Sequence, residues 1–151
     1  MKAVVFDGQL RLATDYEEPQ PPHGEAVIRT TLAGICNTDL EILAGYADFH
    51  GVLGHEFVGI VDWASDAKLI GQRVVGEINV GCGECEICNP TAVASAPVSA
   101  ARVSSAPVSA VRVSSRRVPG QPEYCPNRTA LGIRGRDGVL AERVCLPTSH
   151  L

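Results

Sequence analysis

The chain has 151 residues, of which 45% are hydrophobic and 20% charged, a composition typical of one globular domain rather than of a disordered chain. Its formal net charge of −4 argues against a general nucleic-acid-binding protein. No apolar run approaches membrane-spanning length, and the run at residues 3–6 is too short for a signal-peptide core. We therefore expect a cytoplasmic protein with neither nucleic-acid nor membrane partners.

Short strands dominate the secondary structure that the sequence predicts. The β-branched and aromatic run at residues 2–6 precedes Asp7-Gly8, a favoured turn dipeptide, so we expect an N-terminal hairpin. Residues 25–35 alternate with the two-residue period of a strand that has one buried face. In chain order, strands are expected at residues 2–6, 9–14, 25–35, 57–63, 72–78 and 138–146. Frequent glycines between short strands indicate a mainly β fold with short helices, arranged as a partly open barrel.

A short helix is expected at residues 39–43. Asn37 or Thr38 can cap its N-terminus, because either side chain can accept a hydrogen bond from the first turn. Gly45 follows the helix and is the residue type that most often ends one.

Candidate metal ligands lie on both sides of this helix in the sequence. Cys36 precedes the helix, and His55 and Glu56 follow it within GHEFVG, whose glycines permit close backbone approach. Cys, His and Glu are side chains that zinc accepts in sites that keep one coordination position open for chemistry. Taken singly, they could equally be a buried cysteine and a turn histidine. Because the intervening residues can loop back, the sequence predicts one metal site formed by all three.

A second group of cysteines lies in the sequence GCGECEIC, where Cys82, Cys85 and Cys88 have a C-x2-C-x2-C spacing. Three thiolates at this spacing can surround one tetrahedral zinc ion, and a fourth ligand would complete the site. Cys125 is the natural candidate for the fourth ligand. Without a recognisable signal peptide, metal binding is favoured over disulfide bonds. We interpret the remaining thiol in this half of the chain, Cys145, as a buried side chain.

The segment between Cys88 and Cys125 has a composition of its own. Residues 96–105 read APVSAARVSS and residues 106–115 read APVSAVRVSS, so one unit is present twice. Two periods are too few for a solenoid. We interpret about 90–122 as a disordered, low-complexity insertion within a zinc lobe at 81–127. A weak hairpin, or an anionic partner for its arginines, is the alternative.

The motifs GICNTD and GHEFVG resemble the catalytic-zinc signature of the medium-chain zinc-dependent alcohol dehydrogenases. The cysteine run and the later CPNRTALGI resemble the structural zinc lobe of that family, C-x2-C-x2-C-x7-C, with a longer final connection here. The resemblance extends from residue 1 to about 147. It covers the N-terminal catalytic domain of the family and implies a GroES-like fold over 1–151. It also supports a structural zinc ion on Cys82, Cys85, Cys88 and Cys125.

The resemblance also implies roles around the first metal site. A catalytic zinc ion on Cys36, His55 and Glu56 would bind an alcohol oxygen and lower its pKa. Thr38 matches the family hydroxyl that relays the proton away, and Asp39 matches the carboxylate that orients the ligand imidazole. A helix cap and a favourable first-turn charge are the simpler interpretations of these two residues. Hydride would pass from a small-molecule alcohol or polyol to NAD or NADP.

Family members continue with a Rossmann domain, and this sequence contains no G-x-G-x-x-G unit that would begin one. We therefore expect a truncated dehydrogenase domain that is inactive alone and has no Rossmann domain for NAD or NADP. A homo-oligomer or a partner chain is compatible with the sequence. The alternatives are a non-catalytic zinc-binding module that pairs with another chain, and a defective gene product.

Overall fold

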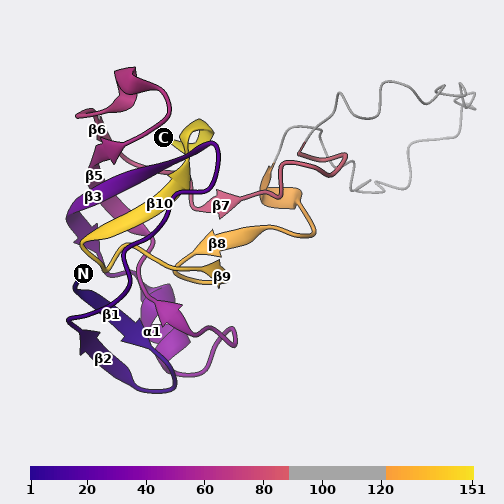
Figure 1. The fold of residues 1–151 in the computed structure, drawn as a ribbon. Coiled ribbons are helices and arrows are strands. Elements are labelled where there is room, and N and C mark those ends of the chain that lie inside the picture. Colours follow the sequence, from indigo (N-terminus) through magenta and orange to yellow (C-terminus); the bar gives the residue numbers. More distant parts are fainter. Residues whose placement is uncertain (89–121) are drawn as a thin grey trace, which may run out of the picture. The chain divides into compact units, whose positions relative to one another are not determined.

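The computed structural model describes residues 1–88 and 122–151 (Figure 1). The chain divides into two units, of which unit 1 comprises Met1–Val80 with Thr129–Leu151 and unit 2 comprises Gly81–Arg128. Of the insertion predicted at about 90–122, all but the final residue lies outside the described residues.

The strands of the described residues form three small sheets. The first has the order β2-β1-β4, the second β10-β3-β5-β6 and the third β7-β8-β9, and only the β8–β9 pair is parallel. The strands are β1 (Ala3–Phe6), β2 (Leu10–Ala13), β3 (Glu25–Gly34), β4 (Gly51–Val52), β5 (Glu56–Trp63), β6 (Arg73–Val74), β7 (Asn79–Val80), β8 (Thr129–Leu131), β9 (Gly135–Arg136) and β10 (Arg143–Pro147). The helices are α1 (Asn37–Leu43) and the 3-10 helices η1 (Ala67–Leu69), η3 (Pro122–Tyr124) and η4 (Thr148–His150). The fold is mainly β, as predicted, and its sheets do not close into one barrel.

The main core of unit 1 lies on one face of the sheet that contains β3 and β5. The two-residue period predicted for residues 25–35 is confirmed in the first half of β3, where Ala26 and Ile28 are buried and Arg29 is exposed. It breaks at the register shift before Leu32, which is 66% exposed. From the neighbouring strands, Val61 and Leu146 pack into the same cluster. Each fully buried side chain of this size contributes roughly 1.5–3 kcal/mol. Phe57, which follows Glu56, belongs to the same cluster, so the core anchors the start of β5 next to the candidate site.

A partly buried ion pair connects three strands of unit 1. Arg136 on β9 donates two hydrogen bonds to the Glu25 carboxylate at the start of β3, at 3.0 and 2.8 Å. The same guanidinium donates to the carbonyl oxygen of Cys145 on β10 at 3.2 Å. Such bidentate pairs fix geometry as well as adding energy. β9, β3 and β10 are therefore held in one arrangement by a single arginine.

The predicted helix and one predicted strand need correction. The helix begins at Asn37 with Cys36 in the N-cap position, so the expectation of a later start capped by Asn37 or Thr38 is wrong. The Asp39 carboxylate accepts the Cys36 N–H at 2.8 Å, which stabilises the earlier start. The strand expected at 138–146 begins only at Arg143, because the preceding backbone bonds elsewhere: the Gly138 N–H donates to the Val52 carbonyl oxygen at 2.7 Å.

The strand expected at 72–78 is also wrong. The structure has two short strands instead, β6 and β7, with an irregular segment between them. A Cβ at Gly76 would lie 2.7 Å from Leu146 Cδ1, so the chain passes too close to the core for a side chain. The Glu77 N–H donates to the His150 carbonyl oxygen at 2.9 Å rather than to a neighbouring strand. Tertiary packing here overrides the local β propensity.

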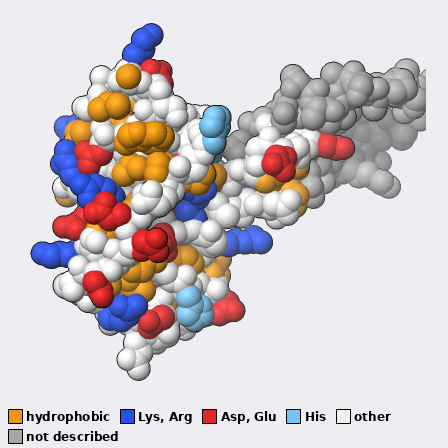
Figure 2. Space-filling model, viewed as in Figure 1, with side chains coloured by type: hydrophobic (Ala, Val, Ile, Leu, Met, Phe, Trp, Pro, Cys, Tyr) orange, Lys and Arg blue, Asp and Glu red, His pale blue; other side chains and the backbone are white. Residues whose placement is uncertain are grey.

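The surface of the molecule mixes charged and apolar side chains. Figure 2 shows Lys and Arg interspersed with Asp and Glu on the face it views, with apolar side chains between them. The described part of this face thus lacks the continuous basic surface that binds nucleic-acid phosphates. Among the described residues, no helix has the length and apolarity required to cross a membrane.

Tyr16 is expected to make the stability of unit 1 sensitive to alkaline pH. Its hydroxyl donates to Asp137 Oδ2 at 2.7 Å, and burial, together with this carboxylate, raises the pKa of Tyr16 from 10.0 to about 12. Because the folded state holds this proton more tightly than the unfolded state, the stability it contributes should be lost as pH rises from 10 to about 12.

Urea denaturation at several pH values measures this loss. Tyr16→Phe should flatten the decline in the free energy of unfolding over that interval. Tyr46→Phe, which changes a tyrosine that is 60% exposed, should leave the decline as in the wild type. A decline that persists unchanged in Tyr16→Phe would contradict the assignment.

Candidate functional site

Cys36, His55 and Glu56 come together in unit 1, as the sequence predicted. Cys36 is the N-cap of α1, His55 directly precedes β5, and Glu56 is the first residue of β5. One potential ligand atom from each of the three lies within 4.8 Å of those of the other two. His55 is buried, Cys36 is half-buried and Glu56 is exposed. The cluster therefore combines a thiol, an imidazole and a carboxylate at the edge of the fold, where a small molecule can approach.

Asp39 connects the two segments that carry these ligands. Its side chain is 3% exposed. The Cys36 N–H donates to Asp39 Oδ2 at 2.8 Å, and the Gly54 N–H donates to Oδ1 at 3.1 Å. One carboxylate thus holds the residue before α1 and the residue before His55. Hydrogen bonds to a charged acceptor are worth about 1.5–3 kcal/mol each, so this carboxylate strongly fixes the spacing of Cys36 and His55.

The imidazole of His55 is the part of the cluster whose hydrogen bonding is incomplete. Its Nδ1 atom is buried with no hydrogen-bond partner, and it lies 3.6 Å from Asp39 Oδ1. That position leaves Nε2 as the ring nitrogen available to a metal ion. Carboxylates commonly orient metal-binding histidines by accepting the proton of the other ring nitrogen. The donor set and this histidine therefore fit a zinc ion, which Cys36, His55 and Glu56 would hold.

Thr38 lies beside Cys36 in the first turn of α1. Its Oγ1 is 3.7 Å from Cys36 Sγ, and its side chain is half-buried in the first turn of α1. A hydroxyl can both accept and donate a proton. The predicted helix-capping role of Thr38 is wrong, because it lies inside the helix.

Gly138, a glycine outside the predicted motif, shapes the turn before His55. Gly138 approaches the Gly54 carbonyl oxygen so closely that a Cβ at Gly138 would overlap it. The Val139 N–H donates to the same oxygen at 3.0 Å. The turn that presents His55 is therefore packed directly on the 138–139 backbone. This role is not evident from the sequence, because a glycine carries no chemical signal beyond its lack of a side chain.

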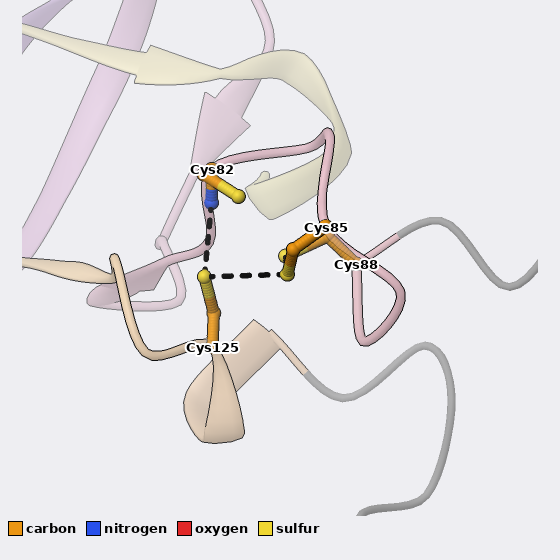
Figure 3. Close-up of side chains that lie close together, drawn as sticks. All are labelled: Cys82, Cys85, Cys88 and Cys125. Atoms are coloured by element: carbon orange, nitrogen blue, oxygen red, sulfur yellow. Dashed lines mark hydrogen bonds between the residues drawn. The ribbon is translucent and has the colours of Figure 1, made fainter. Parts of the chain in front are cut away.

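The four cysteines of unit 2 converge on one point (Figure 3). The Cys85 Sγ lies 3.6 Å from Cys88 Sγ and 3.7 Å from Cys125 Sγ. The Cys82 N–H donates to Cys125 Sγ at 3.4 Å. Ligand atoms of Cys82, Cys85, Cys88 and Cys125 all lie within 4.8 Å of one another. Four sulfur atoms at this separation fit one tetrahedral zinc ion.

The backbone of the cysteine loop favours thiolate formation at one position. The N–H groups of Cys88 and Ile87 point toward Cys85 and lower the pKa of that thiol to about 6. Burial raises the pKa of the Cys88 thiol to about 12. Thiolates are the forms that bind zinc, and a bound cation would offset the mutual repulsion of several thiolates.

Cys145 is separate from both clusters. It is buried on β10, as the sequence predicted, and belongs to neither group of potential ligands among the described residues. Burial raises the pKa of its thiol to about 11. Cys145 therefore stays protonated at neutral pH and serves as a control for experiments on the other cysteines.

Known proteins match this chain over almost its whole length. The family model for the alcohol dehydrogenase GroES-like domain matches residues 22–151. The starvation-sensing protein RspB of Escherichia coli K12 is 34% identical over 157 residues, which cover 99% of this chain and 38% of RspB. The L-threonine 3-dehydrogenase of Streptomyces coelicolor is 34% identical over 163 residues, covering 100% of this chain and 39% of the enzyme.

A crystal structure has the same fold. RspB from Escherichia coli CFT073, complexed with NADH, matches with a TM-score of 0.70 and 26% identity, covering 99% of this chain and 37% of that chain. The chain thus spans less than two-fifths of the length of these relatives. The match of the family model and the shared fold lead to one conclusion: the chain belongs to the medium-chain zinc-dependent alcohol dehydrogenases and carries their GroES-like domain.

Proposed function

We propose that this chain is the substrate-activating part of an NAD- or NADP-linked dehydrogenase that oxidises a small alcohol or polyol. The observation that supports the proposal best is the cluster of Cys36, His55 and Glu56, with ligand atoms within 4.8 Å of one another and with Asp39 between their segments. The relatives support the same reaction class, since one of them is an L-threonine 3-dehydrogenase.

The metal ion and the two residues beside the cluster, Asp39 and Thr38, have separate roles in this proposal. A zinc ion held there would supply Lewis-acid polarisation of an alcohol oxygen. The Asp39 carboxylate, whose Oδ1 lies 3.6 Å from His55 Nδ1, orients the imidazole and keeps Nε2 directed to the ligand position. Thr38 accepts the hydroxyl proton of the alcohol and passes it toward solvent, while the carbinol carbon gives its hydride to the nicotinamide.

We also propose that Cys82, Cys85, Cys88 and Cys125 hold a second, structural zinc ion. Four thiolates leave no position free for a substrate, which is the pattern of structural sites. Such an ion would join the two segments of unit 2 that flank the residues outside the described part of the chain. In zinc-finger peptides, structural zinc contributes about 10–16 kcal/mol, ample to organise a loop of this size.

A chimaera with a relative tests the proposed reaction. The chain would replace the matching part of Escherichia coli RspB, and reduction of NAD or NADP would be followed with a panel of alcohols and polyols. We expect turnover by the chimaera, none by its Cys36→Ala variant, and none by the chain alone, since it has no G-x-G-x-x-G unit to hold the cofactor.

The controls separate the reaction from the alternative of a non-catalytic module. Cys145→Ala in the chimaera should keep full turnover, because that thiol belongs to neither cluster. A folded, zinc-loaded chimaera that oxidises no member of the panel would favour the non-catalytic module. Turnover that survives Cys36→Ala would contradict the assigned metal site.

A further inference from the structure

Gly34 and Glu56 face each other across two strands at the edge of the candidate metal site. Gly34 is the last residue of β3, Glu56 is the first residue of β5, and the two are register partners. A Cβ placed on Gly34 would lie 2.6 Å from Glu56 Oε2 and 3.2 Å from Glu56 Cβ. The Glu56 side chain thus lies across the space that the missing side chain of Gly34 leaves open.

Backbone conformation does not explain the glycine. Gly34 is absent from the glycines of unit 1 with positive φ, so an L-residue could adopt its backbone conformation without strain. The three atoms nearest to its hypothetical Cβ all belong to Glu56. The close approach of one side chain is therefore the feature that requires glycine here.

We propose that Gly34 is a positioning residue that sets the place of the Glu56 carboxylate relative to Cys36 and His55. The inference rests on the proposed metal site. Cys36 follows Gly34 by two residues, and His55 directly precedes Glu56. A potential ligand therefore lies next to each residue of the Gly34–Glu56 pair, at the end of β3 and at the start of β5. With the space above Gly34 free, the carboxylate lies within 4.8 Å of both other ligand atoms.

Alanine at position 34 would displace the carboxylate without unfolding the domain. The nearest atom, Oε2, is at the far end of a flexible side chain and can move by rotation, whereas the Cβ–Cβ approach needs a shift of only a few tenths of an ångström. Misplacing a group that supports a metal site commonly reduces metal affinity by about 10–100-fold. We expect Gly34→Ala to weaken metal binding by that factor.

Cobalt(II) titration of the full chain tests the proposal, with visible d–d absorption reporting the geometry at the Cys36 site. The variants are Gly34→Ala, Glu56→Ala and the double variant. If Gly34 acts through Glu56, the two single variants should each weaken cobalt binding, and Gly34→Ala should add nothing in the Glu56→Ala background. Thiolate-to-cobalt charge transfer from the four cysteines of unit 2 should be unchanged in all variants, because the substitutions lie in unit 1.

Leu32→Ala is the matched control, because it truncates a 66% exposed side chain on the same strand and should leave cobalt affinity unchanged. If Gly34→Ala reduced cobalt affinity by the same factor in the wild type and in Glu56→Ala, the inference would be overturned. A Gly34→Ala variant with the cobalt affinity and spectrum of the wild type would overturn it as well. If cobalt binding is insensitive to Cys36→Ala as well, the proposed metal site itself fails. The two failures are therefore distinguishable.

Discussion

Replacement of Asp39 by alanine is expected to lower the free energy of unfolding by about 2–4 kcal/mol and to weaken metal binding at the Cys36 cluster by about 10–100-fold. The stability loss follows from the N–H groups of Cys36 and Gly54, which lose their common acceptor. The affinity loss follows because the imidazole of His55 loses the carboxylate that lies 3.6 Å from its Nδ1.

Urea denaturation and cobalt titration would measure the two effects separately. Asp39→Asn keeps the volume and one acceptor oxygen, so it should recover part of the stability while binding metal more weakly than the wild type. Glu41→Ala removes an exposed carboxylate from the same helix and should change either quantity little. Wild-type metal affinity in Asp39→Ala would show that the carboxylate does not position His55.

Replacement of Cys125 by serine is expected to reduce the metal affinity of the unit 2 cluster by more than about 100-fold, exceeding the effect of changing an outer partner. Cys125 is the ligand that comes from the far side of the segment outside the described residues, and its Sγ lies 3.7 Å from Cys85 Sγ. Its loss would leave Cys82, Cys85 and Cys88 with an incomplete tetrahedral site.

Competition with a chromophoric zinc chelator would measure this affinity. Cys145→Ser is the control, since it removes the same type of side chain from a buried position outside the cluster. It should leave zinc affinity as in the wild type, although it will reduce stability. If Cys125→Ser retained zinc as tightly as the wild type, a different group would be the fourth ligand.

Ligand spacing in the sequence was sufficient to predict which side chains meet. Cys, His and Glu chemistry singled out Cys36, His55 and Glu56, and the structure brings their ligand atoms together. The same holds for the four cysteines of unit 2. The short spacings of Cys82, Cys85 and Cys88 are local properties, whereas Cys36 and Cys125 were assigned to their groups by residue type and by the family resemblance. The roles of these residues as zinc ligands remain proposals.

Features that depend on specific contacts of individual side chains were not predictable in the same way. The start of α1 moved to Asn37 because the Asp39 carboxylate accepts the Cys36 N–H, whereas propensity alone favoured Asn37 or Thr38 as the cap. Residues 72–78 have β propensity, but Gly76 packs on Leu146 and the ladder ends. The contact between Gly34 and Glu56 depends on strand register, which the sequence of either strand leaves open.

Zinc analysis of the purified, zinc-saturated chain tests the central claim most directly. We predict two zinc ions per chain, one for each cluster of ligand atoms, with one ion lost in Cys36→Ala and neither lost in Cys145→Ala. X-ray absorption spectroscopy of the zinc ion that remains in Cys36→Ala should show that only sulfur atoms coordinate it. A wild-type chain that retains a single ion, or a Cys36→Ala variant that still retains two, would contradict the assignment of Cys36, His55 and Glu56 as a metal site.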